Sequence, residues 1–208
     1  ALMLSRELGD ETGIAIWLIN LGLLLGLQKQ NESALSHFQE ALHLTRQSGN
    51  RASEGAALLN IGNVYRNVGN YALAKAQYLE SLKIAEAIDD LRLEARLRSC
   101  LGTVYDIQGE FRVAKAFFQD SLNAYKKCDD AFGQVEVQFK LANLCLKDNS
   151  AEEAQLVAEE ALMAAEACSF HSFEIRLLWT LGEIALVQND VSSLNFYAIA
   201  AVRAVQYE

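Results

Sequence analysis

The stretch Leu58-Leu-Asn-Ile-Gly-Asn-Val-Tyr65 contains the spacing that organises the whole chain. Its Ile61-Gly62 pair recurs at intervals of 40 residues, with no insertion or deletion. The equivalent pairs are Leu21-Gly22, Leu101-Gly102, Leu141-Ala142 and Leu181-Gly182. Apolar residues within each period lie three and four positions apart, which predicts helices. A regular repeat of this length predicts structural units that bury their apolar faces by stacking on one another.

Two further columns of the repeat predict how the helices pack. The first column, after the small residue, contains Ala34, Ala74, Ala114, Ala154 and Leu194. The second contains Phe38, Tyr78, Phe118, Ala158 and Ala198. We expect the glycines to face the alanines across each pair of helices, where the helix axes approach closely. The aromatic residues then fill the spaces between neighbouring pairs.

Glycine, asparagine and aspartate mark the breaks between helices. One break has Gly69, Gly109, Asn149 and Asn189 in a single column, with Lys29 as the exception. Glycine and asparagine best tolerate the left-handed conformation that ends a helix. At the second break we expect Asp90 and Asp130 to cap the helix that follows. The predicted helices are 1–8, 10–28, 31–47, 51–68, 71–87, 90–108, 111–127, 130–147, 151–167, 171–188 and 191–206.

These columns resemble the tetratricopeptide repeat, whose signature has a leucine-glycine pair, a tyrosine, an alanine and a second aromatic residue at these spacings. The opening stretch and Leu101-Gly-Thr-Val-Tyr105 match best. The period is 40 residues where the family has about 34, and the proline that ends the family's second helix is missing. Long repeats of this kind are similar to those of Pins/LGN-type scaffolds, kinesin light chains, and the sensor regions of bacterial STAND ATPases and maltose-regulator-like activators.

The resemblance implies an all-α fold, a right-handed α-solenoid of antiparallel helix hairpins. It covers residues 1–208 as a single array. The expected units are a half repeat at 1–8 and hairpins at about 10–48, 50–88, 90–128, 130–168 and 170–208. Because Ala1-Leu2 continue a column of the repeat, we expect a segment of a longer protein. Its open N-terminal end would then be available for self-association.

Composition excludes several classes of protein. The 208 residues are 51% hydrophobic and 22% charged, which excludes a disordered chain. A net charge of -9 argues against nucleic-acid binding, because phosphate groups require a basic face. The longest apolar stretch, residues 14–27, is shorter than the roughly 20 residues of a membrane span, so we expect a helix buried on more than one side. The four cysteines lack metal-binding spacing, which favours reduced thiols in a cytoplasmic protein.

No residue pattern predicts catalysis, a cofactor or a metal site. His37 and His43 are six positions apart, whereas one helix face would present two metal ligands four apart. The sequence has no glycine-rich phosphate-binding motif. The aspartate pairs at 89–90 and 129–130 recur at the same turn, which favours helix caps over a catalytic pair. We therefore expect a protein that is not an enzyme.

Exposed positions on the first helix of each hairpin are the candidate binding residues. In the tetratricopeptide repeat family these helices line a concave groove, so the resemblance implies a partner-binding site there. Its candidate residues are Asn63, Arg66, Asn67, Arg96, Ser99, Thr103, Asp106, Phe139, Asn143, Lys147, Arg176, Trp179 and Glu183. Asparagine offers a donor and an acceptor to a peptide backbone, and arginine pairs with carboxylates. The groove's ends are apolar, with Ile16, Ile19 and Leu23 at one of them.

The sequence leaves two functions open. The first is an interaction module that binds a peptide or protein partner in the groove. The second is a ligand-sensing or autoinhibitory arm of a multidomain signalling ATPase or transcription regulator. In that case another domain of the parent protein occupies the groove. For both functions we expect this segment to contact neither nucleic acid nor a membrane. A ligand-dependent change in compaction would separate the two, because a scaffold need not change shape.

Overall fold

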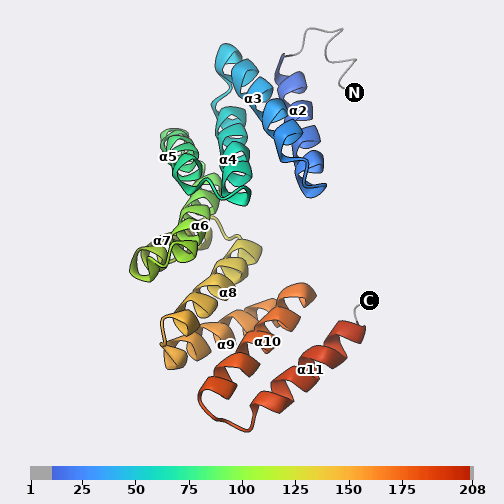
Figure 1. Cartoon of the computed structure of the whole chain (residues 1–208), viewed down its shortest axis with the longest axis vertical. Helices are drawn as coiled ribbons and strands as arrows, with labels where there is room; N and C mark the ends of the chain where they lie inside the picture. The colour runs from blue at the N-terminus through green and yellow to red at the C-terminus, as the bar shows by residue number, and fades with distance from the viewer. Residues whose placement is uncertain (1–10, 207–208) are drawn as a thin grey trace. The chain divides into compact units, whose positions relative to one another are not determined.

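The computed structural model describes residues 11–206, which are helical apart from their turns and contain no strand (Figure 1). The helices are α2 (Glu11–Leu27), α3 (Asn31–Ser48), α4 (Arg51–Asn67), α5 (Tyr71–Ala87), α6 (Leu91–Ile107), α7 (Phe111–Lys127), α8 (Ala131–Lys147), α9 (Ala151–Ala167), α10 (His171–Val187) and α11 (Ser193–Gln206). The predicted helices within this range begin and end within two residues of these bounds. The predicted helix 1–8, and the self-association expected of it, lie outside the described residues.

The chain folds into two compact units, with the boundary inside α6 between Val104 and Tyr105. In the first unit, α2 packs against α3 and α4, and α4 packs in turn against α3 and α5. In the second, α8 packs against α7, α9 and α10, and α10 packs against α9 and α11. Helices therefore contact those one or two places away along the chain, which is the pattern of a helical repeat.

A residue with a left-handed backbone follows each helix from α2 to α10, at intervals of 20 residues. These residues are Lys29, Gly49, Gly69, Asp89, Gly109, Asp129, Asn149, Ser169 and Asn189. After Gly69, the N–H of Asn70 donates to the carbonyl of Tyr65 at 2.8 Å and closes the last turn of α4. The same bond recurs at the other eight turns. Both predicted sets of breaks are therefore confirmed, including the one at Lys29.

Asp90 and Asp130 cap the helices that follow them, as predicted. Oδ1 of Asp90 accepts the N–H of Leu93 at 2.9 Å, and Asp130 makes the same bond to the N–H three residues later. Their neighbours Asp89 and Asp129 hold the left-handed position. The two aspartates of each pair thus have separate structural roles at the turn.

The glycine of the repeat lies against an aromatic ring. A Cβ atom at Gly62 would lie 2.5 Å from the ring of Tyr78, and one at Gly22 would lie 2.5 Å from the ring of Phe38. At these two glycines the atoms nearest to the place of a side chain belong to the aromatic rings, a contact that the expected pairing of glycine with alanine did not include. Phe38 also packs with Ile61 of the next hairpin, so the ring fills the space between hairpins as predicted. Glycine is required because the ring occupies the place of its side chain.

We predict opposite effects of alanine at two helical glycines. Gly62→Ala forces a methyl group against the fully buried Tyr78 ring and should lower the free energy of unfolding by about 1–3 kcal/mol. Gly26→Ala meets no atom within 4 Å and should raise it by about 0.5–1 kcal/mol. Urea unfolding followed by circular dichroism measures both changes. Equal effects at the two positions would contradict the close contact at Gly62.

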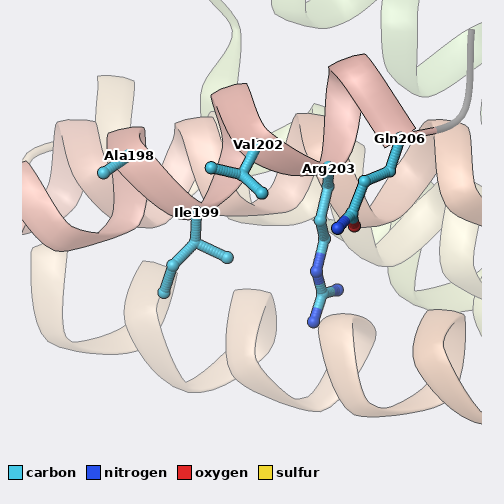
Figure 2. A pocket seen from close by; sticks show the side chains of 5 residues that line it. All are labelled: Ala198, Ile199, Val202, Arg203 and Gln206. Carbon is cyan, nitrogen blue, oxygen red and sulfur yellow. The ribbon is translucent and has the colours of Figure 1, made fainter.

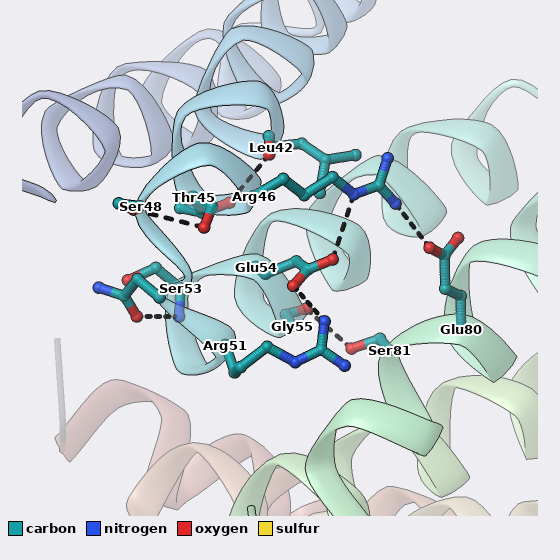
Figure 3. Close-up of polar contacts among 11 residues, drawn as sticks. Leu42, Thr45, Arg46, Ser48, Arg51, Ser53, Glu54, Gly55, Glu80 and Ser81 are labelled. Carbon is teal, nitrogen blue, oxygen red and sulfur yellow. Dashed lines mark hydrogen bonds and ion pairs between the residues drawn. The ribbon is translucent and has the colours of Figure 1, made fainter. Parts of the chain in front are cut away.

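A buried carboxylate joins three helices of the first unit (Figure 3). Glu54 of α4, only 4% exposed, accepts hydrogen bonds from Arg46 Nε at 3.1 Å and from Arg51 Nη1 at 2.6 Å. Arg46 belongs to α3, and its Nη2 also reaches Glu80 of α5 at 2.6 Å. Beside this cluster, the Ser81 hydroxyl donates to a carbonyl of α4 at 2.8 Å. Charged and polar bonds therefore link the stacked hairpins in addition to apolar contact.

The same position is a buried glutamate again in the second unit. Glu174 of α10 is 3% exposed and accepts from Arg203 Nη1 of α11 at 2.8 Å. Arg203 Nη2 donates to Glu166 of α9, also at 2.8 Å, and His171 Nδ1 lies 3.1 Å from Glu174. In both units one arginine therefore bridges a buried acid and an exposed acid on different helices. Neither cluster was predicted from the sequence.

Removing the two acids that Arg46 bridges should have unequal effects. Glu54→Ala removes a buried acid that accepts two charge-assisted hydrogen bonds, while both arginines stay about half exposed to water, and it should cost about 1.5–3 kcal/mol of unfolding free energy. Glu80→Ala removes an exposed partner of the same arginine and should cost under about 1 kcal/mol. Chemical denaturation of the two variants tests this difference. A Glu54→Ala protein as stable as Glu80→Ala would show that the buried cluster contributes little to stacking.

Helix α2 is less buried than predicted. Its buried residues are Ala15, Leu18 and Gly22, whereas Leu24 is 53% and Leu27 is 83% exposed. The expectation that residues 14–27 are buried on more than one side is therefore wrong for the described part of the chain, because only α3 and α4 cover this helix there. None of the helices within residues 11–206 combines the length and the apolar character that crossing a membrane requires.

Candidate functional site

A hollow of about 440 Å³ in the first unit brings together residues of α2 and α4. Its apolar side has Leu23, Gly26 and Leu27 of α2. Its polar side has Asn60, Asn63, Arg66 and Asn67 of α4, which follow one another at helical spacing. Three of the predicted groove residues therefore lie together here, beside apolar side chains that the sequence placed at one end of the groove.

Asn63 is held by a neighbouring helix. The hydroxyl of Tyr78 donates to Asn63 Oδ1 at 2.9 Å, and the thiol of Cys100 donates to the same oxygen at 3.8 Å. Burial, reinforced by the nearby Cys100, raises the pKa of Tyr78 above the usual range of a phenol. The hydroxyl therefore keeps its proton and remains a donor at physiological pH. Asn63 Oδ1 is thus engaged, while its Nδ2 group makes no bond to any described residue.

Asn60 is a residue of the hollow that the sequence analysis missed. Its side chain is largely buried, and its Nδ2 donates to the carbonyl of Ala56 at 2.9 Å. It stands three residues before Asn63, on the same face of α4. The family pattern of exposed positions did not include it, and the helical spacing of asparagines in α4 was the signal that could have found it.

Arg66 supplies the positive charge of the hollow. Its Nη2 lies 3.5 Å from Asn67 Oδ1, and it forms no ion pair with any residue in the described range. An arginine in this state has its planar donor groups available to a carboxylate. The hollow therefore combines an apolar side, the three amide side chains of Asn60, Asn63 and Asn67 on α4, and one cation.

The predicted residues of α6 are arranged differently. Arg96 is exposed but does not line the hollow. Ser99 is only 3% exposed, and its carbonyl accepts the Thr103 hydroxyl at 2.9 Å. The prediction that Ser99 lies on an exposed groove surface is therefore wrong. The equivalent Leu59 is buried as well, so this position of the repeat faces inward in these two hairpins.

In the second unit, most predicted site residues bond to one another. Lys147 Nζ contacts both carboxylate oxygens of Asp106, at 2.8 and 2.9 Å. Asn143 Nδ2 donates to the carbonyl of Phe139 at 2.7 Å. The guanidinium of Arg176 lies 4.1 Å from the centre of the Phe139 ring. These side chains therefore have partners within the fold and offer fewer free groups to a ligand than α4 does.

Two further candidate residues lie on α10. The centres of the Trp179 and Tyr197 rings lie 4.8 Å apart, and Trp179 is 48% exposed. Glu183 is exposed on the same helix. A second, shallower hollow of about 300 Å³ runs along α11, where Figure 2 shows Ile199 and Val202 beside Arg203. Its polar residues are Gln206 and Arg203, and the guanidinium of Arg203 already bonds to two glutamates.

The described residues hold no group of three or more histidine, cysteine or acidic side chains placed to bind a metal ion. All four cysteines are free thiols. Burial, with a smaller contribution from Glu153, raises the pKa of Cys145 to about 11. This thiol therefore remains protonated at neutral pH, and a protonated thiol is a weak nucleophile.

Two family models, both described as tetratricopeptide repeat, match residues 53–127 and residues 14–48. Together with the helix pairs, the recurring turns and the glycine-aromatic contacts, these matches identify the chain. It belongs to the tetratricopeptide repeat family, as the resemblance predicted. Its fold is an all-α repeat solenoid. No curated protein matches the chain by sequence.

Solved structures with the same fold cover nearly the whole chain. BtubC (BKLC) from P. vanneervenii matches with a TM-score of 0.87 and 16% identity, covering 99% of this chain and 87% of that one. The STAND protein with a tetratricopeptide repeat sensor from Pyrococcus horikoshii matches at 0.80 and 17% identity, over 98% of this chain and 32% of that one. A Rap protein complexed with Competence and Sporulation Factor matches with a TM-score of 0.81 and 15% identity, covering 94% of this chain and 55% of that one.

Thiol alkylation should separate the buried and exposed cysteines. At pH 8 we expect iodoacetamide to modify Cys168, which is exposed, at least about tenfold faster than Cys145, whose raised pKa and burial deprive the reagent of an accessible thiolate. Peptide mass spectrometry over a time course measures both rates. In urea the two cysteines should react alike. Rapid labelling of Cys145 in the folded protein would show that it is an accessible, activated thiol.

Proposed function

We propose that this protein is an interaction module that binds an extended peptide in the hollow between α2 and α4. The tetratricopeptide repeat fold supports the general role of a protein-interaction module. The observation that carries the more specific proposal is the convergence of Asn60, Asn63, Arg66 and Asn67 with an apolar side in one open hollow. A peptide matches this combination, because its backbone needs amide partners and its side chains supply the apolar and charged groups.

The side chains of the hollow define the chemistry of the partner. Leu23 and Leu27 are 45% and 83% exposed, and covering them removes apolar surface from water. Arg66 favours a carboxylate on the partner. We therefore propose a peptide with an apolar residue close to an acidic one. Arg96, which we expected at the centre of the groove, is not part of this proposal because it does not line the hollow.

The Rap structure supports a peptide partner by analogy, because that protein was solved in complex with Competence and Sporulation Factor and its fold covers 94% of this chain. At 15% identity the likeness extends to the fold alone. The proposed setting is cytoplasmic, where the four free thiols stay reduced. The proposed role is binding without catalysis.

Selection from a random library of short peptides tests the proposal. Peptides that bind the wild-type chain should lose about tenfold in affinity to Asn63→Ala, because one amide partner of the backbone is removed. Fluorescence anisotropy measures the Kd values. Asn143→Ala is the matched control, since Asn143 occupies the same repeat column but its Nδ2 already bonds to Phe139.

Two outcomes would contradict peptide binding in this hollow. One is a selection that yields no peptide with saturable binding. The other is a set of peptides that bind Asn63→Ala and Asn143→Ala as tightly as the wild type. Circular dichroism of each variant shows beforehand that its helical content is unchanged.

A sensor arm of a larger signalling protein is the second candidate function. The specific observation is the fit of 98% of this chain to the STAND protein with a tetratricopeptide repeat sensor, of which it spans 32%. In this case the partner includes other domains of the parent protein. Small-angle X-ray scattering with and without a selected peptide separates the candidates. A change in radius of gyration favours the sensor, and an unchanged value favours the interaction module.

A further inference from the structure

We propose that Tyr78 is a positioning residue that fixes the amide of Asn63 with its Nδ2 toward the hollow, and that Asn60 offers the complementary acceptor. Asn60 and Asn63 would then form hydrogen bonds with the N–H and the C=O of a single peptide residue. These two bonds would select the direction in which the peptide chain binds. This inference rests on the proposed function, because it concerns how the same hollow recognises its peptide.

The contacts of Asn63 give its amide a preferred orientation. Its Oδ1 accepts from two donors, the hydroxyl of Tyr78 at 2.9 Å and the thiol of Cys100 at 3.8 Å. Turning the amide over would place its NH₂ group toward these two donors and leave their protons without this acceptor. An unmade bond of a buried donor is costly. Nδ2 is therefore left for the hollow that Asn63 lines.

The position of the Tyr78 hydroxyl is fixed by the packing of its ring. The ring is fully buried and lies against Gly62, the residue immediately before Asn63. The ring thus meets α4 at two successive residues, with carbon atoms at one and the hydroxyl at the other. A rigid donor of this kind can orient a partly exposed amide in the absence of ligand.

Asn60 has the opposite polarity. Its Nδ2 is committed to the Ala56 carbonyl at 2.9 Å, so its remaining group is the acceptor Oδ1. That oxygen has no hydrogen-bond partner within the described residues. Asn60 and Asn63 lie on one face of α4, one turn apart. The face therefore presents an acceptor followed by a donor.

An extended peptide residue presents its own N–H and C=O on the same side. Its N–H fits Asn60 Oδ1 and its C=O fits Asn63 Nδ2, so the bound peptide runs in the same direction as α4. Arg66 comes one turn after Asn63 and faces the same hollow. The carboxylate of the partner is then expected on the C-terminal side of the anchored residue.

The other repeats lack this combination. The equivalents of Asn63 are Leu23, Thr103, Asn143 and Glu183, and those of Tyr78 are Phe38, Phe118, Ala158 and Ala198. Asparagine and tyrosine thus occur together in one repeat of the five. At Asn143, where the tyrosine is replaced by alanine, Nδ2 bonds to the helix's own backbone. This contrast indicates that the free Nδ2 depends on Tyr78.

Tyr78→Phe keeps the ring and removes only the hydroxyl, which makes it the test variant. The first measurement uses no peptide: urea midpoints of Tyr78→Phe, Asn63→Ala and the double variant. We expect the double variant to match Asn63→Ala, because each single change removes the same bond. Strictly additive shifts of the midpoint would overturn the positioning contact, whether or not any peptide binds.

The second measurement compares the tightest selected peptide with a peptide of the reversed sequence, both with blocked ends. The wild type should prefer the selected direction by at least about tenfold, and Tyr78→Phe should lose most of that preference. Equal losses for both peptides, with the ratio unchanged, would overturn the inference, since a merely structural role weakens both alike. Non-additive unfolding together with no peptide binding at all would instead contradict the proposed function.

Discussion

The contact between Gly62 and the ring of Tyr78 is the constraint on which both the packing and the candidate site of the first unit depend. The ring fits only because residue 62 has no side chain, and this lets α4 and α5 approach closely. The same approach carries the Tyr78 hydroxyl to Asn63. Gly22 and Phe38 reproduce the packing without the hydroxyl. This column therefore holds a buried aromatic ring in the first three hairpins, and a single oxygen atom makes the α4–α5 hairpin chemically different from the other two.

Charged side chains contribute to the fold in a different way from apolar packing. The buried alanines and aromatic rings of the core recur in the same columns of the first three hairpins. The buried glutamates are more selective, because each needs an arginine at a particular height on a neighbouring helix. Arg46 comes from the helix before Glu54, whereas Arg203 comes from the helix after Glu174. Such pairs favour one neighbour over another, which apolar surfaces of similar shape do not.

The features that could be predicted from the sequence are those set by neighbours along the chain. Helix bounds followed from the turn residues, and Asn63, Arg66 and Asn67 were grouped because the resemblance to the tetratricopeptide repeat implied that these positions line a groove. The Glu54 cluster, the Tyr78 hydroxyl bond and the burial of Ser99 depend on side chains brought from other helices. Asn60 was missed for a related reason: its proposed role depends on which of its two amide groups is already bonded. Repetition predicts where residues stand but not which bonds they make.

The regular spacing of the turns limits how such a chain can change its length. Each helix and its turn occupy 20 residues, and every helix turns by about 100° for each residue added. A single residue inserted into α4 would rotate the remainder of that helix and carry Asn63 away from Tyr78. Gain or loss of 40 residues, in contrast, restores every column to its place. Insertions and deletions in this chain are therefore expected to survive selection chiefly as whole hairpins, while smaller ones are confined to the turns.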